Sequence, residues 1–230
     1  MALFLYIDTA GDKATIAISK DDTLLALANN EQSNTHANFV QVAIENVLAT
    51  AQITLAAIDA IVVTMGPGSY TGLRVGLASA KGIAYALNKP LIGLSTLALL
   101  AEHANNHTIA KRIPGNYQIF SMIDARRMEV FGAVYDAHLN PTMAEQAIVL
   151  DTPILENLLN QGSLICIGNG APKTMDLISS PLLHQITDRY EITDMIKLAS
   201  TKWERTDFEN TAYSSPAYLK DFYQPPAKSL

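Results

Sequence analysis

Short apolar runs open the chain and predict a β-meander. The runs cover residues 2–8, 13–19 and 23–29, and the breaks between them fall at residues 10–12 and 21–22. The breaks contain glycine and aspartate, which favour tight turns because they tolerate backbone conformations that other residues avoid. We therefore expect three consecutive strands at the start of the chain.

The apolar spacing then changes to that of alternating helices and strands. Between residues 38 and 51 the apolar positions follow the period of an α-helix. Residues 60–63 are uncharged and mostly β-branched, as in a buried parallel strand. A second helix is predicted over residues 69–87, and a short strand over residues 91–93.

The second half of the chain repeats this order. Residues 118–134 resemble residues 2–18, since each stretch is a strand ending in Ile-Asp, a tight turn and a second strand, with Asp8 and Asp124 as matched acids. A strand, a Gly-Asn-Gly turn and a helix-like segment follow from residue 164. We therefore expect an α/β fold of two duplicated lobes, each a mixed β-sheet with flanking helices.

An Ile-Pro-Gly loop at residues 113–115 suggests where one lobe ends. We expect an N-terminal lobe over residues 1–110, with helices that face a partner, and a degenerate C-terminal lobe over residues 111–230. The aromatic segment at residues 214–222 is expected to pack back on the body of the protein.

The densest motif is the glycine turn GPGSYTGLRVG at residues 66–76. Amides at the start of the following helix could hold an anion. The turn is not a Walker loop, and Thr71 stands where the dinucleotide fingerprint requires its third glycine. Packing is the other explanation, because Gly72, Gly76 and Ala80 recur every fourth residue and form a stripe of small side chains.

Composition narrows the functional classes. Only 17% of the 230 residues are charged, the net charge is −6, and Cys166 is the single cysteine. These values argue against a globally basic nucleic-acid binder and exclude an intrachain disulfide. The longest apolar stretch, Leu91 to Ala101, is about half of the roughly 20 residues that a membrane span requires. We expect a soluble, cytoplasmic protein.

Several short motifs, in order along nearly the whole chain, resemble those of the TsaB family, also called YeaZ. The glycine turn is the most specific of them. The others are IDTA at 7–10, Thr35-His36, GLSTL at 93–97, IDAR at 123–126 and PAYLK at 216–220. In the last motif, Lys220 stands where arginine is common in the family. The resemblance implies an actin-like, Hsp70-like fold of two lobes.

The resemblance also implies a role in making threonylcarbamoyladenosine beside the anticodon of certain tRNAs. In that system TsaD transfers the threonylcarbamoyl group, and TsaE is an ATPase that acts on the complex. A TsaB-like chain would be a non-catalytic subunit that pairs with TsaD, self-pairs when alone, meets tRNA only through the complex and contacts no membrane. The implied interface lies on two helices, with the residues Phe39, Ala43, Val47, Thr71, Gly72, Val75, Gly76, Ser79 and Ala80.

Histidines at two positions four apart hold the metal of TsaD, and Thr96 and Leu100 occupy those positions here. Neither side chain can replace imidazole as a ligand, so no catalytic residue and no metal ligand is expected. His103 and His107 have metal-ligand spacing, but we interpret them as a surface pair. For His36 we favour a capping or hydrogen-bonding role.

Asp8 and Asp124 match the acids that surround the metal and phosphates in actin-like ATPases. A remnant of such a site would comprise Asp8, Gly66, Gly68, Ser69, Asp124, Gly168 and Gly170. We expect structural roles for both acids and no cofactor in the isolated chain, with ATP or ADP at most at a subunit junction. The alternative is an enzyme, either a nucleotide hydrolase or a glycoprotease-like metallopeptidase.

The second hairpin turn carries adjacent arginines. Arg126 and Arg127 could form a salt-linked turn with Glu129, which we favour, or could contact a phosphate of tRNA or of a nucleotide at a subunit junction.

Overall fold

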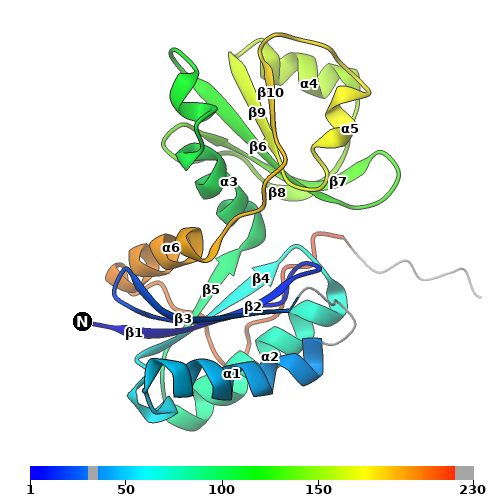
Figure 1. The fold of residues 1–230 in the computed structure, drawn as a ribbon. Helices are drawn as coiled ribbons and strands as arrows, with labels where there is room; N and C mark the ends of the chain where they lie inside the picture. The colour runs from blue at the N-terminus through cyan, green and yellow to red at the C-terminus, as the bar shows by residue number, and fades with distance from the viewer. Residues whose placement is uncertain (31–35, 221–230) are drawn as a thin grey trace, which may run out of the picture.

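The computed structural model describes residues 1–30 and 36–220. Two lobes stand one above the other, and each is built on one five-stranded mixed sheet (Figure 1). The sheet orders are β3-β2-β1-β4-β5 and β10-β9-β6-β7-β8, which is one topology used twice. The predicted fold of two duplicated α/β lobes is therefore confirmed.

The first sheet combines an antiparallel meander with two parallel strands. Its strands are β1 (Leu3–Asp8), β2 (Ala14–Lys20), β3 (Thr23–Asn30), β4 (Ala60–Gly66) and β5 (Leu91–Ser95). Strand β1 pairs antiparallel with β2 and parallel with β4. The predicted strands lie at these places, and β4 runs past the expected end because Thr64 to Gly66 continue its pairing with β5.

Both faces of the first sheet are covered, because successive side chains of β1 alternate between them. Leu5 and Ile7 pack with helices α1 (His36–Ala51) and α2 (Tyr70–Leu87). On the opposite face, Phe4 and Tyr6 pack with α3 (Thr96–Asn106) and α6 (Ile192–Glu204). A short 3-10 helix, Leu55–Ala57, precedes β4.

The second sheet repeats the first with smaller helices. Its strands are β6 (Tyr117–Asp124), β7 (Glu129–Asp136), β8 (Pro141–Val149), β9 (Ser163–Ile167) and β10 (Leu183–Ile186). Helices α4 (Thr152–Leu159) and α5 (Pro172–Met175) flank it, and a 3-10 turn, Ala110–Arg112, precedes β6. The helix expected after the Gly-Asn-Gly turn is only the four residues of α5.

The chain returns to the first lobe after β10. Helix α6 packs on the first sheet, and Glu209 bridges to Leu91 at the edge of β5. The Lys81 amine donates to the carbonyls of Ala212 at 3.1 Å and Ser214 at 2.9 Å. The tail therefore packs back as predicted, as far as Lys220. The lobe boundary near residue 110 stays a prediction. No helix within the described ranges is long and apolar enough to cross a bilayer.

The stripe of small residues on α2 lets this helix approach β1 closely. A Cβ atom at Gly76 would lie 2.2 Å from Thr9 Oγ1, and one at Gly72 would lie 2.1 Å from the Thr9 carbonyl oxygen. The Thr9 hydroxyl donates to the Gly72 carbonyl at 2.7 Å. The stripe is therefore packing within this chain.

We expect Gly76→Ala to lower the free energy of unfolding by about 1–3 kcal/mol, because the added methyl group overpacks the contact with Thr9. Gly82→Ala on the same helix is the matched control, since a Cβ atom there meets nothing within 4 Å. The control should gain up to about 1 kcal/mol from helix propensity. Urea unfolding of both variants measures this, and equal stabilities would contradict the close contact.

Candidate functional site

A cleft of about 550 Å³ lies between the lobes, where matched turns of the two sheets face each other. The first lobe contributes residues 10–13 with Gly68 and Ser69, and the second contributes Ile123, Asp124, Gly168 and Asn169. The segment 187–190, which links β10 to α6, forms a further wall. Most of the predicted nucleotide-remnant residues are thus brought together here. Asp8 lies beside the cleft, and Gly66 and Gly170 belong to the turns that frame it.

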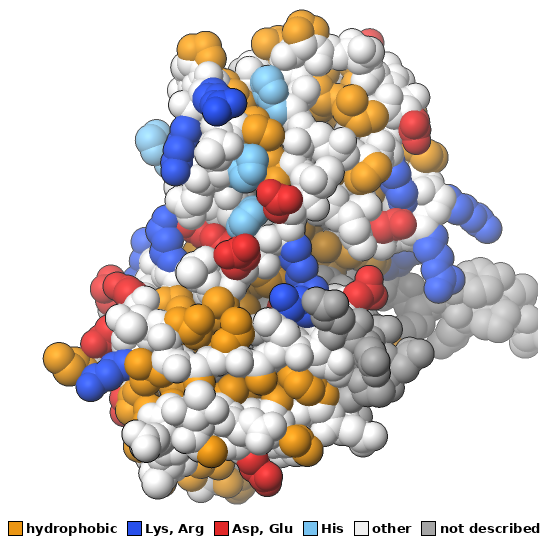
Figure 2. Space-filling view, in the orientation of Figure 1, with side chains coloured by type: hydrophobic (Ala, Val, Ile, Leu, Met, Phe, Trp, Pro, Cys, Tyr) orange, Lys and Arg blue, Asp and Glu red, His pale blue; other side chains and the backbone are white. Residues whose placement is uncertain are grey.

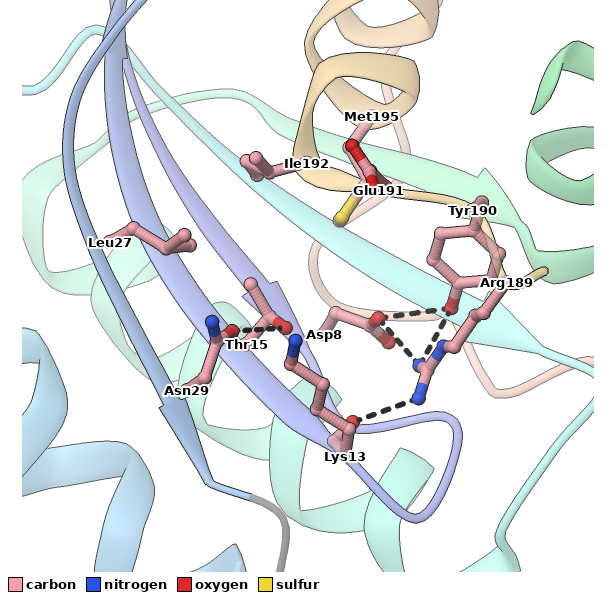
Figure 3. Close-up of a pocket in the computed structure, with 10 residues that line it drawn as sticks. All are labelled: Asp8, Lys13, Thr15, Leu27, Asn29, Arg189, Tyr190, Glu191, Ile192 and Met195. Atoms are coloured by element: carbon pink, nitrogen blue, oxygen red, sulfur yellow. Dashed lines mark hydrogen bonds and ion pairs between the residues drawn. The ribbon is translucent and has the colours of Figure 1, made fainter. Parts of the chain in front are cut away.

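Asp8 ends β1 and is only 2% exposed, so its carboxylate requires partners within the protein. One oxygen accepts hydrogen bonds from the Ala10 amide at 3.0 Å and the Thr64 hydroxyl at 2.8 Å. The other accepts from Arg189 Nη2 at 3.0 Å and from the Tyr190 hydroxyl at 2.9 Å (Figure 3). Both oxygens are therefore engaged by the chain itself.

Arg189 fills the end of the cleft. Its guanidinium donates to the Lys13 carbonyl at 3.3 Å and lies 5.0 Å from the centre of the Tyr190 ring. A Cβ atom at Gly11 would come within 2.7 Å of Arg189 Nη1, so the glycine makes room for this side chain. Burial raises the pKa of Tyr190 far above its usual range, which keeps its hydroxyl protonated as a donor to Asp8.

Arg189 and Tyr190 also separate the cleft from a second cavity of about 400 Å³. Figure 3 shows this cavity, with Leu27 and Asn29 of β3 on one side and Ile192 of α6 on the other. Sequence reasoning missed the roles of Arg189 and Tyr190. The only available signal was an aspartate at the end of an apolar strand, which predicts a buried carboxylate in need of a cation.

Asp124, the matched acid of the second lobe, is also paired. Lys173 Nζ lies 2.5 Å from its carboxylate, and this contact lowers the pKa of Asp124. The Arg126 amide donates to the same carboxylate at 2.7 Å, and the Asp124 amide donates to Asn169 Oδ1 at 2.8 Å. Each matched acid is thus paired with a cation of this chain, Asp8 with Arg189 from the segment after β10 and Asp124 with Lys173 of α5.

The predicted salt-linked turn is wrong. The Glu129 carboxylate pairs with Lys220 of the tail, 2.5 Å away, and not with Arg126 or Arg127. The tail brings this lysine back across the molecule, so a partner 91 residues away replaces the neighbours in sequence.

The glycines of the predicted phosphate turn serve close packing. A Cβ atom at Gly68 would lie 2.2 Å from the Ala10 carbonyl oxygen, and one at Gly168, whose φ is +102°, would lie 2.1 Å from the Met122 carbonyl oxygen. Gly66 also has a positive φ, and Leu73 and Val130 crowd the positions of Gly66 and Gly170. The Ser69 hydroxyl caps α2 by accepting from the Gly72 amide at 3.3 Å.

Thr96 and Leu100 lie one helical turn apart on α3, and both line the cleft. They are 3% and 2% exposed, so a hydroxyl and an isobutyl group face inward at the two positions that the resemblance matches to the metal-binding histidines of TsaD. No group of three or more His, Cys, Asp or Glu side chains able to hold a metal ion occurs within residues 1–30 and 36–220.

The two histidines expected as a surface pair are half-buried, and each contacts an aspartate. His103 Nδ1 lies 2.8 Å from the Asp194 carboxylate, with 17% of its side chain exposed, and His107 Nε2 lies 3.5 Å from Asp188. The first contact ties α3 to the first turn of α6, and the second ties the C-cap of α3 to the segment before α6. The prediction for His36 concerns a side chain outside the described residues.

Much of the predicted partner surface faces inward. Five of its residues are buried within this chain: Ala43, Val47, Gly72, Gly76 and Ala80. They pack against the first sheet, so their side chains are not available to a partner. Thr71 is exposed, while Phe39, Val75 and Ser79 are half-buried. Val42, Tyr70 and Tyr85 on the same helices are 57%, 41% and 84% exposed, and periodicity could have indicated them.

Two lobes of one topology around a cleft place the protein in a class, the α/β proteins with a duplicated actin-like fold. Residues 27–221 match the family model of "TsaD: tRNA N6-adenosine threonylcarbamoyltransferase". The tRNA threonylcarbamoyladenosine biosynthesis protein TsaB of Escherichia coli is 32% identical over 180 residues, which cover 75% of this chain and 74% of that protein. The chain belongs to the TsaB branch of this family.

Solved structures agree on the fold. YeaZ from Pseudomonas aeruginosa superposes with a TM-score of 0.79 at 23% identity, over 95% of this chain and all of that one. An inorganic polyphosphate/ATP-glucomannokinase from Arthrobacter sp. superposes with a TM-score of 0.50 at 10% identity, over 90% of this chain and 100% of that one. The kinase shares the fold alone.

We expect Arg189→Met to lower the free energy of unfolding by about 2 kcal/mol, because it leaves the buried Asp8 carboxylate without its cation. This is less than for a fully buried pair, since 34% of the Arg189 side chain is exposed. Adding Asp8→Asn should recover part of the loss. Arg112→Met, at an exposed arginine, is the control and should change stability by less than about 0.5 kcal/mol. Additive losses in the double variant would contradict the pairing.

Stability should also depend on the protonation of His103. The hydrogen bond to Asp194 raises the pKa of His103 above its usual value. The contact therefore contributes fully below the unfolded pKa of about 6.5 and is lost as the pH rises through the folded value. Urea midpoints of the native protein should fall between pH 6 and pH 8.5, and His103→Gln should flatten that fall. An identical fall in the variant would exclude His103 as its source.

Proposed function

We propose that this chain is a non-catalytic subunit of the machinery that makes threonylcarbamoyladenosine in tRNA, and that it pairs with the transferase TsaD. Membership of the TsaB family supports the pathway. The match to the TsaD family model supports the pairing, since it makes this chain a relative of the transferase, and a two-fold interface joins the same patch of two like chains.

The observation that carries the non-catalytic role is that the two acids beside the cleft are already paired with the chain's own side chains. Arg189 and Tyr190 donate hydrogen bonds to one carboxylate oxygen of Asp8, and Lys173 forms an ion pair with Asp124. A metal-nucleotide complex needs free carboxylate oxygens, and a positive guanidinium beside Asp8 opposes a cation there. This arrangement weighs against the nucleotide hydrolase and metallopeptidase alternatives.

The pairing surface in this proposal is the outer side of α1 and α2. Hydrophobic side chains are visible on the first lobe in Figure 2, and Val42 and Tyr85 project from the two helices. Large exposed apolar side chains on adjacent helices are typical of protein interfaces. Self-pairing uses the same face in this account, so self-dimer and heterodimer exclude each other. TsaE, tRNA and any ATP or ADP join at the assembled complex, in the cytoplasm.

Size-exclusion chromatography with light scattering tests the pairing directly. The chain is run alone, TsaD of the same organism is run alone, and the two are mixed. A one-to-one species that forms at the expense of the self-dimer supports the proposal. An unchanged elution profile would overturn it.

A pair of valine variants locates the surface. Val42→Asp should weaken binding to TsaD by about tenfold or more, because burying an unpaired carboxylate in an interface is costly. Val149→Asp is the matched control, since Val149 is 64% exposed on β8 of the other lobe. Both variants should unfold at the same urea concentration as the native protein. Equal affinities for TsaD would move the interface away from α1.

A further inference from the structure

The turn between β6 and β7 projects from the second lobe beside the cleft (Figure 1). Its tip is Arg126-Arg127-Met128, and all three residues are exposed. Both arginines have left-handed backbones, with φ of +73° and +49°. Side chains with a Cβ atom disfavour this region, which glycine and asparagine occupy most readily. Both arginines thus bear a conformational cost that glycine or asparagine would reduce, and the strain suggests a function.

The base of this turn is fixed by lysines. Lys173 pairs with Asp124 and also donates to the Glu129 carbonyl at 2.8 Å, so it joins the two ends of the turn. Only 16% of the Lys173 side chain is exposed. Lys220 pairs with the Glu129 carboxylate. Both acids beside the tip, Asp124 and Glu129, are therefore paired with lysines and not with the two arginines.

The guanidinium groups of Arg126 and Arg127 are available to bind another molecule. Within the described part of the chain, neither the Arg126 nor the Arg127 side chain makes a hydrogen bond or ion pair. The tip is thus a locally positive point on a chain whose net charge is −6. Lys and Arg side chains are visible along this edge of the second lobe in Figure 2.

Guanidinium groups bind phosphate oxygens through two parallel hydrogen bonds. We propose that Arg126 and Arg127 contact backbone phosphates of the tRNA when this chain is part of the assembled complex. The inference rests on the proposed function, which brings a polyanion to the assembly. Two arginines at one turn fit one or two phosphates, so the contact positions the tRNA and reads no sequence.

Binding of tRNA to the reconstituted complex with TsaD tests the proposal at several salt concentrations. The variant combines Arg126→Asn with Arg127→Gly, which removes both charges and suits the left-handed backbone. We expect tRNA affinity to fall several-fold, and the slope of log affinity against log salt to decrease by about 0.7–0.9 for each phosphate that the variant no longer binds. The melting temperature of the variant should rise, so weaker binding cannot be attributed to unfolding.

Two controls complete the experiment. Lys111→Ala with Arg112→Ala removes the same charge from an exposed turn elsewhere and should leave tRNA affinity unchanged. Arg126→Lys with Arg127→Lys keeps both charges but loses the paired hydrogen bonds, so it should keep the salt dependence and recover only part of the affinity. Light scattering shows separately whether each variant still pairs with TsaD. Pairing of the unmodified chain with TsaD tests the proposed function itself. Unchanged tRNA affinity in an intact complex would overturn the phosphate contact. A variant that no longer pairs with TsaD would also overturn it, because the tip would then bind an acidic surface of the partner protein and not the tRNA.

Discussion

The ion pair between Asp8 and Arg189 is the constraint that organises the two lobes. A carboxylate that is only 2% exposed must be paired, and its cation comes from the segment that follows the second sheet. This segment must therefore return to the cleft, and α6 and the tail continue from it onto the first lobe. Two histidine contacts strengthen the return: His103 of α3 pairs with Asp194 in the first turn of α6, and His107 pairs with Asp188 of the segment itself.

The duplication explains the cleft, and two ion pairs explain why its acids are not free. Both lobes end their first strand in aspartate, and the matched turns of the two sheets still face each other. In each case a cation of this chain holds the carboxylate, Arg189 for Asp8 and Lys173 for Asp124. The outer surfaces proposed for partners, α1 and α2 on one lobe and the β6–β7 turn on the other, lie away from these two ion pairs.

The apolar pattern predicted most of the strands, the two long helices and the duplication, because these depend on local periodicity and turn residues. The length of α5 was not predictable, since packing of the small second lobe determines it. The stripe of Gly72, Gly76 and Ala80 showed close packing but not its direction, because periodicity cannot distinguish a sheet of the same chain from a partner. Roles that depend on distant residues escaped sequence reasoning, and the Lys220 pairing of Glu129 is the clearest case.

The central claim is that the acids of the cleft are already paired within the chain. Calorimetric titration of the isolated chain with ATP, with and without magnesium, tests it most directly. The account predicts that magnesium does not strengthen ATP binding, because Asp8 and Asp124 are already paired within the chain. Magnesium-dependent binding of ATP that Asp8→Asn abolishes would contradict it, since Asp8 would then serve a metal and not Arg189.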